Sequence, residues 1–571
     1  MKSIVYWILG CFTFAVFVYI SPSKSFAQMT RREVRYQWKR AGSAYKKKKY
    51  ELASRLLFDI IENGAAIPQY QRYSRYLLAR SLFRQRLYLV SLRYAIQLLQ
   101  NTKGNKVDRP FIGTLNGLLK IATTIGDETL VIKMLRLVKP LQRKIPKAFR
   151  KNPIAYLLPV PKRTQKSARK TKRWIKRRNK LRDPLYYLLG RLYFMKRSPG
   201  FPMAHLLLSQ ISKTAVNNYF AKGLFLRGVM FAWKKRNLEA IKAFREIKKL
   251  TPMSKKVETE FKQIQEFAQY GIARAYYALG VQTKSDTVAR KLLVRSLREY
   301  ARLKKKRGVI QAEVLFETSY VHFMMGQYHF ALGKLIALQS PYYKMGFFPE
   351  LQIVRSLIYY KNCKYSDTLA SVKHFQTTYA PLKKQLKELV SRRKKKKWLI
   401  QYYEYFLKQD SLLKNKQKTK LPPSLIALMS SGKAIRNYRS LLINLGKELT
   451  IIRSKGARWK ESNLGRALLE VALNFRTTLK KFAGGTIWYS LKRNLSEVSN
   501  LLGQAMIIQL ETLQAQKKEL MRYAEGGGIE QDEYRYTIVT EQSHIYWPYQ
   551  GEYWRDEIGN YRQFIQGECK R

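Results

Sequence analysis

Acidic side chains are scarce in this sequence, which has 37 Asp and Glu residues against 111 Lys and Arg residues. The acids are mostly isolated, so no pair of carboxylates for hydrolysis can be nominated. Histidine is equally scarce, and the five histidines follow no metal-ligand spacing: they are His205, His322, His329, His374 and His544. These shortages argue against an enzyme, and we expect no catalytic residue, no metal and no cofactor.

Long hydrophobic runs are missing after residue 20, and the one that precedes it has the features of a leader. Lys2 gives a short positive region, residues 4–20 are almost wholly apolar, and Ser25-Phe26-Ala27 supplies small residues for a signal peptidase. This order predicts a signal peptide that is cleaved after Ala27, which would make the protein exported and periplasmic. The alternative is that residues 4–20 stay as an inner-membrane anchor.

Cysteine is also rare, with three residues in the chain. Cleavage after Ala27 would remove Cys11 and leave Cys363 and Cys569 in a compartment where disulfides persist. These two cysteines either form one disulfide or remain separate thiols. A disulfide-rich scaffold is excluded in both cases.

Basic residues are what the sequence has in excess, and its formal net charge is +74. Such a surface attracts polyanions, and salt weakens that attraction. We take as candidate contacts to an anionic surface the most concentrated cations: Lys46, Lys47, Lys48, Lys49, Arg177, Arg178, Lys394, Lys395, Lys396 and Lys397. In the envelope the partner would be anionic lipid, lipopolysaccharide or an acidic protein; a plain solvated surface and nucleic-acid binding are the alternatives.

Internal repeats organise the first two thirds of the chain. Small and apolar residues recur at the same internal offsets in five segments, as expected where two antiparallel helices touch. The five sets are Ala41, Ala44, Tyr50, Ala53, Leu57 and Ile60; Ala79, Leu82, Tyr88, Ser91, Ala95 and Leu98; Gly228, Phe231, Ala240, Phe244 and Ile247; Ser319, His322, Tyr328, Ala331, Leu335 and Leu338; and Ser356, Tyr359, Tyr365, Thr368, Val372 and Phe375.

This pattern resembles the tetratricopeptide repeat, a helix-turn-helix unit of about 34 residues. The resemblance covers residues 30 to 380 and implies an all-α solenoid whose stacked helix pairs bind proteins or peptides. A generic bundle of amphipathic helices is the alternative, because it shows the same periodicity.

The chain divides by composition into seven segments. We expect the signal peptide at 1–27, repeats at 28–139 and 184–385, a basic linker at 386–423, a helical bundle at 424–525 and an aromatic, acidic segment at 526–571. Residues 140–183 should interrupt the repeats, because their prolines break helices. In Lys162 to Arg182, 12 of 21 residues are basic, so we expect that stretch to be extended or loosely helical.

The C-terminal segment carries four large rings within eight residues: Trp547, Tyr549, Tyr553 and Trp554. Exposed rings at this density favour aggregation, so we expect them to dock, either on the 424–525 bundle or as anchors in a partner. The stretch from Tyr546 to Glu557 resembles the closing motif of tetratricopeptide-type envelope proteins of predatory and gliding bacteria, including components of gliding-motility machinery. That resemblance implies a role in a periplasmic assembly.

The function that these features favour is a non-catalytic protein-protein interaction scaffold of the bacterial cell envelope, in a complex for motility, secretion or envelope assembly. A peptidoglycan enzyme with helical repeats is one alternative, although the region after residue 424 lacks the acids and motifs for it. A basic nucleic-acid-binding protein is the other, and the leader argues against it. Neither the partner proteins nor the oligomeric state follows from the sequence.

Overall fold

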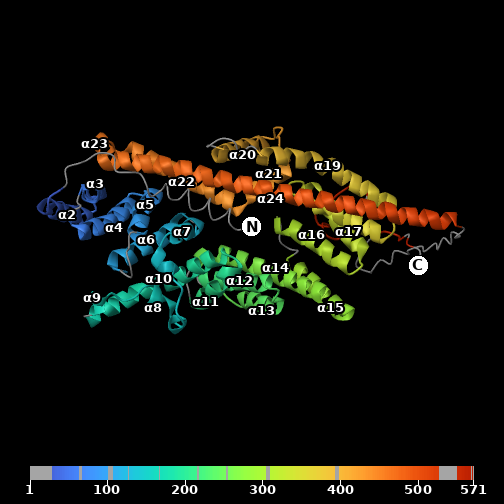
Figure 1. Cartoon of the computed structure of the whole chain (residues 1–571), viewed down its shortest axis with the longest axis horizontal. Coiled ribbons are helices and arrows are strands. Elements are labelled where there is room, and N and C mark those ends of the chain that lie inside the picture. The colour runs from blue at the N-terminus through green and yellow to red at the C-terminus, as the bar shows by residue number, and fades with distance from the viewer. Residues whose placement is uncertain are drawn as a thin grey trace. The chain divides into compact units, whose positions relative to one another are not determined.

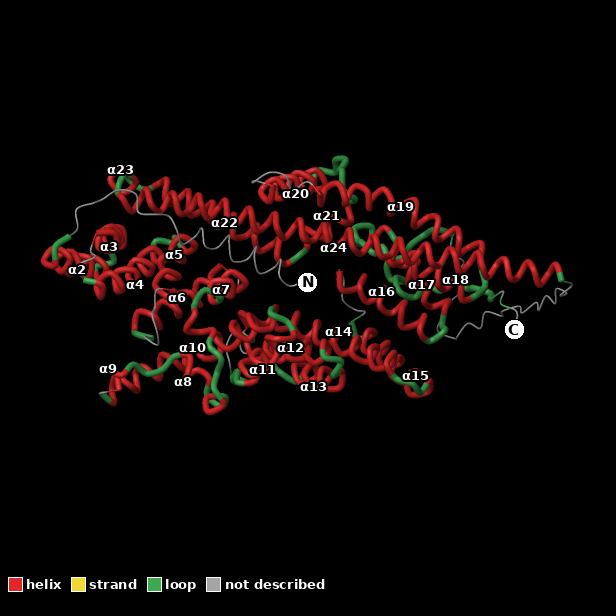
Figure 2. The backbone as a smooth tube through the Cα atoms, in the orientation of Figure 1, coloured by secondary structure: helices red, strands yellow, loops and turns green. Residues whose placement is uncertain are grey.

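The computed structural model describes residues 29–63, 67–100, 107–125, 128–165, 167–214, 218–252, 255–303, 309–391, 398–525, 550–567 and 569. Within these ranges the chain forms helices joined by turns and loops, with no strand (Figure 2). Consecutive helices pack against their neighbours, so the predicted all-helical fold is confirmed at this level. The expected signal peptide at 1–27 lies outside the described residues.

The chain forms two compact units. The first contains residues 1–271 and 436–483, and the second contains residues 272–435 and 484–571. The boundaries fall within three helices, which Figure 1 labels α14, α22 and α24.

The first unit is built from short helices, most of which follow one another closely in the sequence. They are α2 (Arg31–Lys46), α3 (Tyr50–Asn63), α4 (Pro68–Arg84), α5 (Tyr88–Gln100), α6 (Arg109–Ile125), α7 (Glu128–Leu135), α8 (Pro153–Leu157), α9 (Lys162–Gln165), α10 (Ala168–Phe194), α11 (Phe201–Ser209), α12 (Tyr219–Trp233), α13 (Asn237–Lys248), the start of α14 (Glu258–Gln282), most of α22 (Lys433–Ser454), α23 (Ala457–Lys460) and the start of α24 (Asn463–Ala524). Single 3-10 turns lie at Lys139–Gln142, Lys147–Phe149, Ser198–Gly200 and Lys255–Val257.

The second unit contains the remainder of α14 and α24 with the helices between them. These are α15 (Asp286–Ala301), α16 (Val309–Met324), α17 (Tyr328–Gln339), α18 (Glu350–Lys361), α19 (Tyr365–Ser391), α20 (Trp398–Lys414) and α21 (Pro423–Ser431). A 3-10 turn at Pro341–Tyr343 precedes α18, and the non-helical residues 550–567 complete the unit.

Five helix pairs share one turn geometry, and they coincide with the five segments of recurring sequence. The pairs are α2–α3, α4–α5, α12–α13, α16–α17 and α18–α19. Each turn has three residues, and the middle one has a positive φ between 58° and 71°: Lys48, Arg86, Lys235, Gly326 and Cys363. The next N–H donates to a carbonyl five residues earlier, as from Lys49 to Ala44 over 2.9 Å. This is the Schellman end of a helix, which reverses the chain so that the second helix returns along the first.

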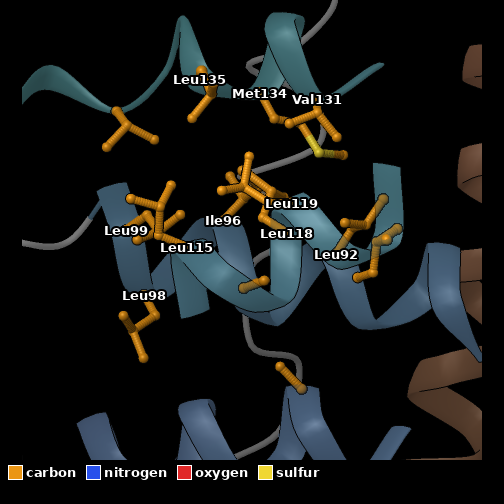
Figure 3. Close-up of a cluster of buried hydrophobic side chains, with 14 of the residues drawn as sticks. Leu92, Ile96, Leu98, Leu99, Leu115, Leu118, Leu119, Val131, Met134 and Leu135 are labelled. Carbon is orange, nitrogen blue, oxygen red and sulfur yellow. The ribbon is translucent and has the colours of Figure 1, made fainter. Parts of the chain in front are cut away.

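The recurring small residues lie at the contacts between paired helices. Ala41, Ala53, Ala240 and Ala331 are each fully buried. Leucine, isoleucine and valine side chains then fill the space between successive helices. Figure 3 shows one such cluster in the first unit, formed by α5, α6 and α7, and its labelled residues are Leu92, Ile96, Leu98, Leu99, Leu115, Leu118, Leu119, Val131, Met134 and Leu135.

The basic stretch from Lys162 to Arg182 is more regular than its charge suggests. We expected an extended or loosely helical chain, whereas α10 is a continuous helix of 27 residues from Ala168. Its buried residues Trp174, Arg178, Leu181 and Leu185 follow helical spacing. This apolar stripe packs on neighbouring helices while most of the cations stay in solvent, so burial outweighs the repulsion between like charges.

The segments after residue 385 also differ from expectation. The expected linker at 386–423 contains α20, whose Tyr402, Tyr403 and Phe406 are buried. The expected bundle at 424–525 is divided, because residues 436–483 belong to the first unit and residues 484–525 to the second. More than half of it is the 62-residue helix α24, which is continuous through Gly484. A Cβ at Gly484 would collide with the carbonyl oxygen of Leu399, so this glycine serves close packing and does not break the helix.

Candidate functional site

The C-terminal residues 550–567, which we call the strap, lie across helix pairs of the second unit. Ile558 is buried in a hydrophobic cluster with residues of α16, α17 and α18, and Tyr561 and Ile565 pack against the same cluster. Residues 561–567 form neither helix, strand, turn nor bend. The helical array therefore holds an irregular stretch of chain on its surface.

The strap is held through its main chain as well as its side chains. The Gln563 N–H donates to the carbonyl oxygen of His329 in α17 over 3.1 Å. Lys334, also in α17, donates from Nζ to the carbonyl oxygen of Gly559. Gly333 lies between His329 and Lys334 in the sequence of α17. A Cβ at this position would collide with the carbonyl oxygen of Tyr561. The missing side chain thus allows the strap to approach the α17 backbone.

Ring contacts supply further specificity. The guanidinium carbon of Arg562 lies 4.6 Å from the centre of the Phe330 ring, a distance at which a cation is attracted to an aromatic face. The rings of His329 and Phe564 are nearly parallel, with centroids 6.4 Å apart. Burial, and secondarily the Arg562 charge, lowers the pKa of His329, which favours a neutral imidazole beneath the strap.

The first part of the strap folds back against Tyr561, which belongs to the same segment. The Trp554 N–H donates to the Tyr561 hydroxyl over 2.8 Å, and burial raises the pKa of Tyr561. The rings of Tyr553 and Tyr561 meet edge to face at 6.0 Å. Tyr342 donates weakly to the Tyr553 carbonyl over 3.4 Å.

A disulfide fixes the end of the strap. Cys569 is bonded to Cys363, which is the positive-φ residue of the α18–α19 turn. The two cysteines are 206 residues apart in the sequence. The structure therefore pairs two cysteines whose state the sequence left open.

The other candidate residues are dispersed. Lys46 to Lys49 are exposed at the α2–α3 turn, and Arg177 is exposed on α10. Arg178 is buried, and this burial lowers the pKa of its guanidinium, so it is not exposed for contact with an anionic surface. Lys394, Lys395, Lys396, Lys397, Trp547 and Tyr549 lie outside the described residues.

The strap contacts differ from those expected of the four aromatic anchors. Trp554 is 50% exposed, so about half of its surface stays in solvent. The anchoring residues are Ile558, Tyr561 and Ile565, which sequence reasoning missed. The signal that the sequence offered for these anchors was the spacing of three apolar residues directly after the acidic residues of the strap. The strap also packs on repeat helices, whereas we considered the 424–525 bundle as its internal docking site.

No protein-family model matches this chain. No curated protein matches it either. In the part of the chain that the structure describes, no helix is both long enough and apolar enough to cross a membrane. The same residues contain no group of three or more His, Cys, Asp or Glu side chains placed to hold a metal ion. The contacts and charges of the described surfaces are thus the grounds for a functional assignment.

Proposed function

We propose that this chain is a non-catalytic interaction scaffold of the cell envelope, whose helix pairs are of the tetratricopeptide type and hold segments of partner proteins. One observation carries the proposal: helices α16, α17 and α18 already bind a peptide segment, the strap of the same chain. A surface that holds one irregular segment by main-chain hydrogen bonds and apolar anchors has what peptide recognition needs.

The strap indicates the chemistry of a partner segment. It combines aromatic rings with the acids Glu552, Asp556 and Glu557, in a chain whose net charge is +74. Opposite charge speeds the encounter of such a segment with a basic array, and a few apolar and aromatic anchors supply most of the binding energy. The expected partner is therefore an envelope protein with an acidic, aromatic-rich segment.

The envelope assignment has two independent supports. The leader-like residues before Gln28 favour export. The Cys363–Cys569 bond favours an oxidising compartment, because structural disulfides are rare in the cytosol. The structural disulfide and the leader point to the same compartment.

The test is binding of the strap sequence in trans. The full chain would carry Cys569→Ser, Ile558→Ser and Tyr561→Ser, which remove the tether and two anchors, so that its own strap no longer competes. We expect a fluorescent peptide of residues 552–567 to bind this variant, measured as a rise in fluorescence anisotropy. Adding Gly333→Leu should abolish binding, because the new side chain occupies the position of the Tyr561 carbonyl.

Gly503→Leu is the matched control, because Gly503 is a helical glycine of the same unit with no atom near its Cβ position. It should leave peptide binding unchanged. Circular dichroism would verify that each variant stays helical. A helical, untethered chain that does not bind the peptide, or that binds it equally with Gly333→Leu, would contradict the proposed recognition surface.

A further inference from the structure

A cavity of about 460 Å³ lies in the first unit between α4, α5, α6 and α10. Its volume is within the range of sites that hold small molecules. All its lining residues lie between Tyr76 and Leu181, so the cavity belongs to one compact unit and is separate from the strap.

Six cations line this cavity: Arg80, Arg84, Arg109, Lys120, Arg177 and Lys180. Among the described residues that line it, none is acidic. Arg80 is held in place, since its guanidinium carbon lies 5.5 Å from the Tyr76 ring centre and its Nη1 donates to the Tyr76 hydroxyl over 3.1 Å. Cations from three helices thus surround a cavity whose described lining contains no carboxylate, which favours an anionic ligand.

Two buried polar side chains in the lining have no hydrogen-bond partner among the described residues. Trp174 is 5% exposed and its Nε1 is unpaired, and Thr114 is 4% exposed with an unpaired hydroxyl. A buried donor without an acceptor is costly, so such groups are normally paired. A ligand that brings acceptor oxygens into the cavity would satisfy both.

Apart from Ser91, Asn116 and two glycines, the rest of the lining is apolar. Its apolar side chains are Ala79, Phe83, Ala95, Ile112, Leu118, Ile121 and Leu181. A simple inorganic anion would leave these walls uncovered, whereas a ligand with a hydrocarbon part would bury them. The lining therefore matches a molecule with one charged end and one apolar end.

We propose that this cavity binds an amphiphile whose charged end is a phosphate monoester. The phosphate lies among the cations, and the apolar part lies along the walls between α4 and α6. A phosphate group carries close to two negative charges and three strong acceptor oxygens, which suit several arginine forks together. A single carboxylate would need only one or two of these cations, so phosphate accounts for the lining better.

The test uses the full-length protein and isothermal titration calorimetry with three water-soluble probes: dihexanoyl phosphatidic acid, dihexanoyl phosphatidylcholine and inorganic phosphate. We expect phosphatidic acid to bind at least about tenfold more tightly than either of the others, because only it presents both an exposed phosphate monoester and acyl chains. Equal binding of inorganic phosphate would show a plain anion site and overturn the apolar half of the proposal. Equal binding of phosphatidylcholine would overturn the phosphate half.

Gly117 offers a variant that fills the cavity without disturbing the fold. It lines the cavity, lies within α6 and has no atom within 4 Å of its Cβ position. Gly117→Glu should therefore abolish phosphatidic acid binding while the chain stays folded. Gly446→Glu is the control, because Gly446 is a helical residue of the same unit with equally open surroundings but outside the cavity. Equal effects of both variants would assign the binding to net charge and overturn the site.

Two further variants separate the cavity from general charge. Trp174→Phe removes the unpaired donor and keeps a ring, so we expect weaker binding at an unchanged or higher melting temperature. Arg177→Gln should weaken binding more than Lys172→Gln, which removes the same charge from the same helix away from the lining. Binding that none of these changes alters would place the ligand elsewhere.

Discussion

At the scale of single residues, two carboxyl groups of the second unit lie in contact with each other. Glu350 at the start of α18 is hydrogen-bonded to Glu497 of α24. Burial, together with the Glu497 carboxyl, raises the pKa of Glu350 to about 7. Tyr320 and Tyr379 also face Glu350, and burial raises the pKa of each to about 12, so both stay neutral. The Glu350 carboxyl thus keeps its proton at pH values below about 7.

This pair predicts a pH dependence of stability. Because the pKa of Glu350 is higher in the folded chain than its ordinary value of 4.5, folding takes up a proton between pH 4.5 and about 7. The contribution of this proton is present below pH 4.5 and is lost as the pH rises through about 7. We expect the melting temperature to fall over this range, and Glu497→Gln to flatten the curve.

Glu448 also affects how the melting temperature depends on pH, but it does not affect the comparison of wild type with Glu497→Gln. It accepts from the N–H groups of Leu89 and Val90 at the start of α5, and burial raises its pKa to about 7 as well. Its slope belongs to the first unit and should be the same in wild type and Glu497→Gln. Melting curves of the two proteins that stay parallel from pH 5 to 8 would refute a role for the Glu350–Glu497 pair.

At the scale of elements, the common turn of the helix pairs has a conformational cost. Lys48, Arg86, Lys235 and Cys363 adopt the left-handed conformation that glycine alone adopts easily, and Gly326 is the one glycine among the five turns. We expect Gly326→Ala to destabilise the second unit by about 1 kcal/mol. No atom lies within 4 Å of the added Cβ, so the loss would be purely conformational.

Gly503→Ala is the control of opposite sign. It lies in the middle of α24 in the same unit, also with open space around its Cβ position. There alanine should stabilise the helix by roughly 0.5–1 kcal/mol. Urea midpoints of the two variants should move in opposite directions from wild type, and a common direction would show that the turn does not constrain residue 326.

The helix pairs could be predicted from the sequence because their information is local. The offsets from Ala41 to Ile60 report a contact between neighbouring helices, and Ala53, Leu57 and Ile60 are indeed fully buried. The helicity of residues 168–182 could not be predicted from their charge, since it depends on burying Trp174 and Leu181 against other helices. The division of α24 between two units likewise depends on contacts that no local pattern encodes.

The candidate site was harder to predict from the sequence for the same reason. The anchors Ile558 and Tyr561 meet helices more than 190 residues earlier in the chain, so their apolar character alone did not reveal a partner. The cysteine pair was visible, but its pairing depends on the fold. The cavity of the first unit was indicated only by Arg177, one of its six cations.

At the scale of the whole molecule, several of the few acids form ion pairs within the fold. Asp108 pairs with Arg72 over 2.6 Å, and Glu128 pairs with Arg191 and Lys222 over 2.8 and 3.0 Å. Lys and Arg outnumber Asp and Glu by 111 to 37, and this excess gives the net charge of +74. Long-range attraction to polyanions is therefore a property of the entire chain, whereas we propose that specificity comes from the strap surface and the cavity.

The last prediction concerns the export of the whole chain, and alkylation of its cysteine thiols tests it. If the leader is removed after Ala27, the mature protein begins at Gln28, has lost Cys11, and keeps its two remaining cysteines in the Cys363–Cys569 bond. Protein isolated from its native cells, denatured without reductant and treated with an alkylating reagent should then carry no label. A retained membrane anchor would add one label at Cys11, and a chain kept in a reducing compartment would add three. Mass spectrometry of the intact protein distinguishes these states and identifies the N-terminal residue together with them. Met1 at the N-terminus would contradict cleavage after Ala27, and label on Cys363 and Cys569 would contradict the proposed export.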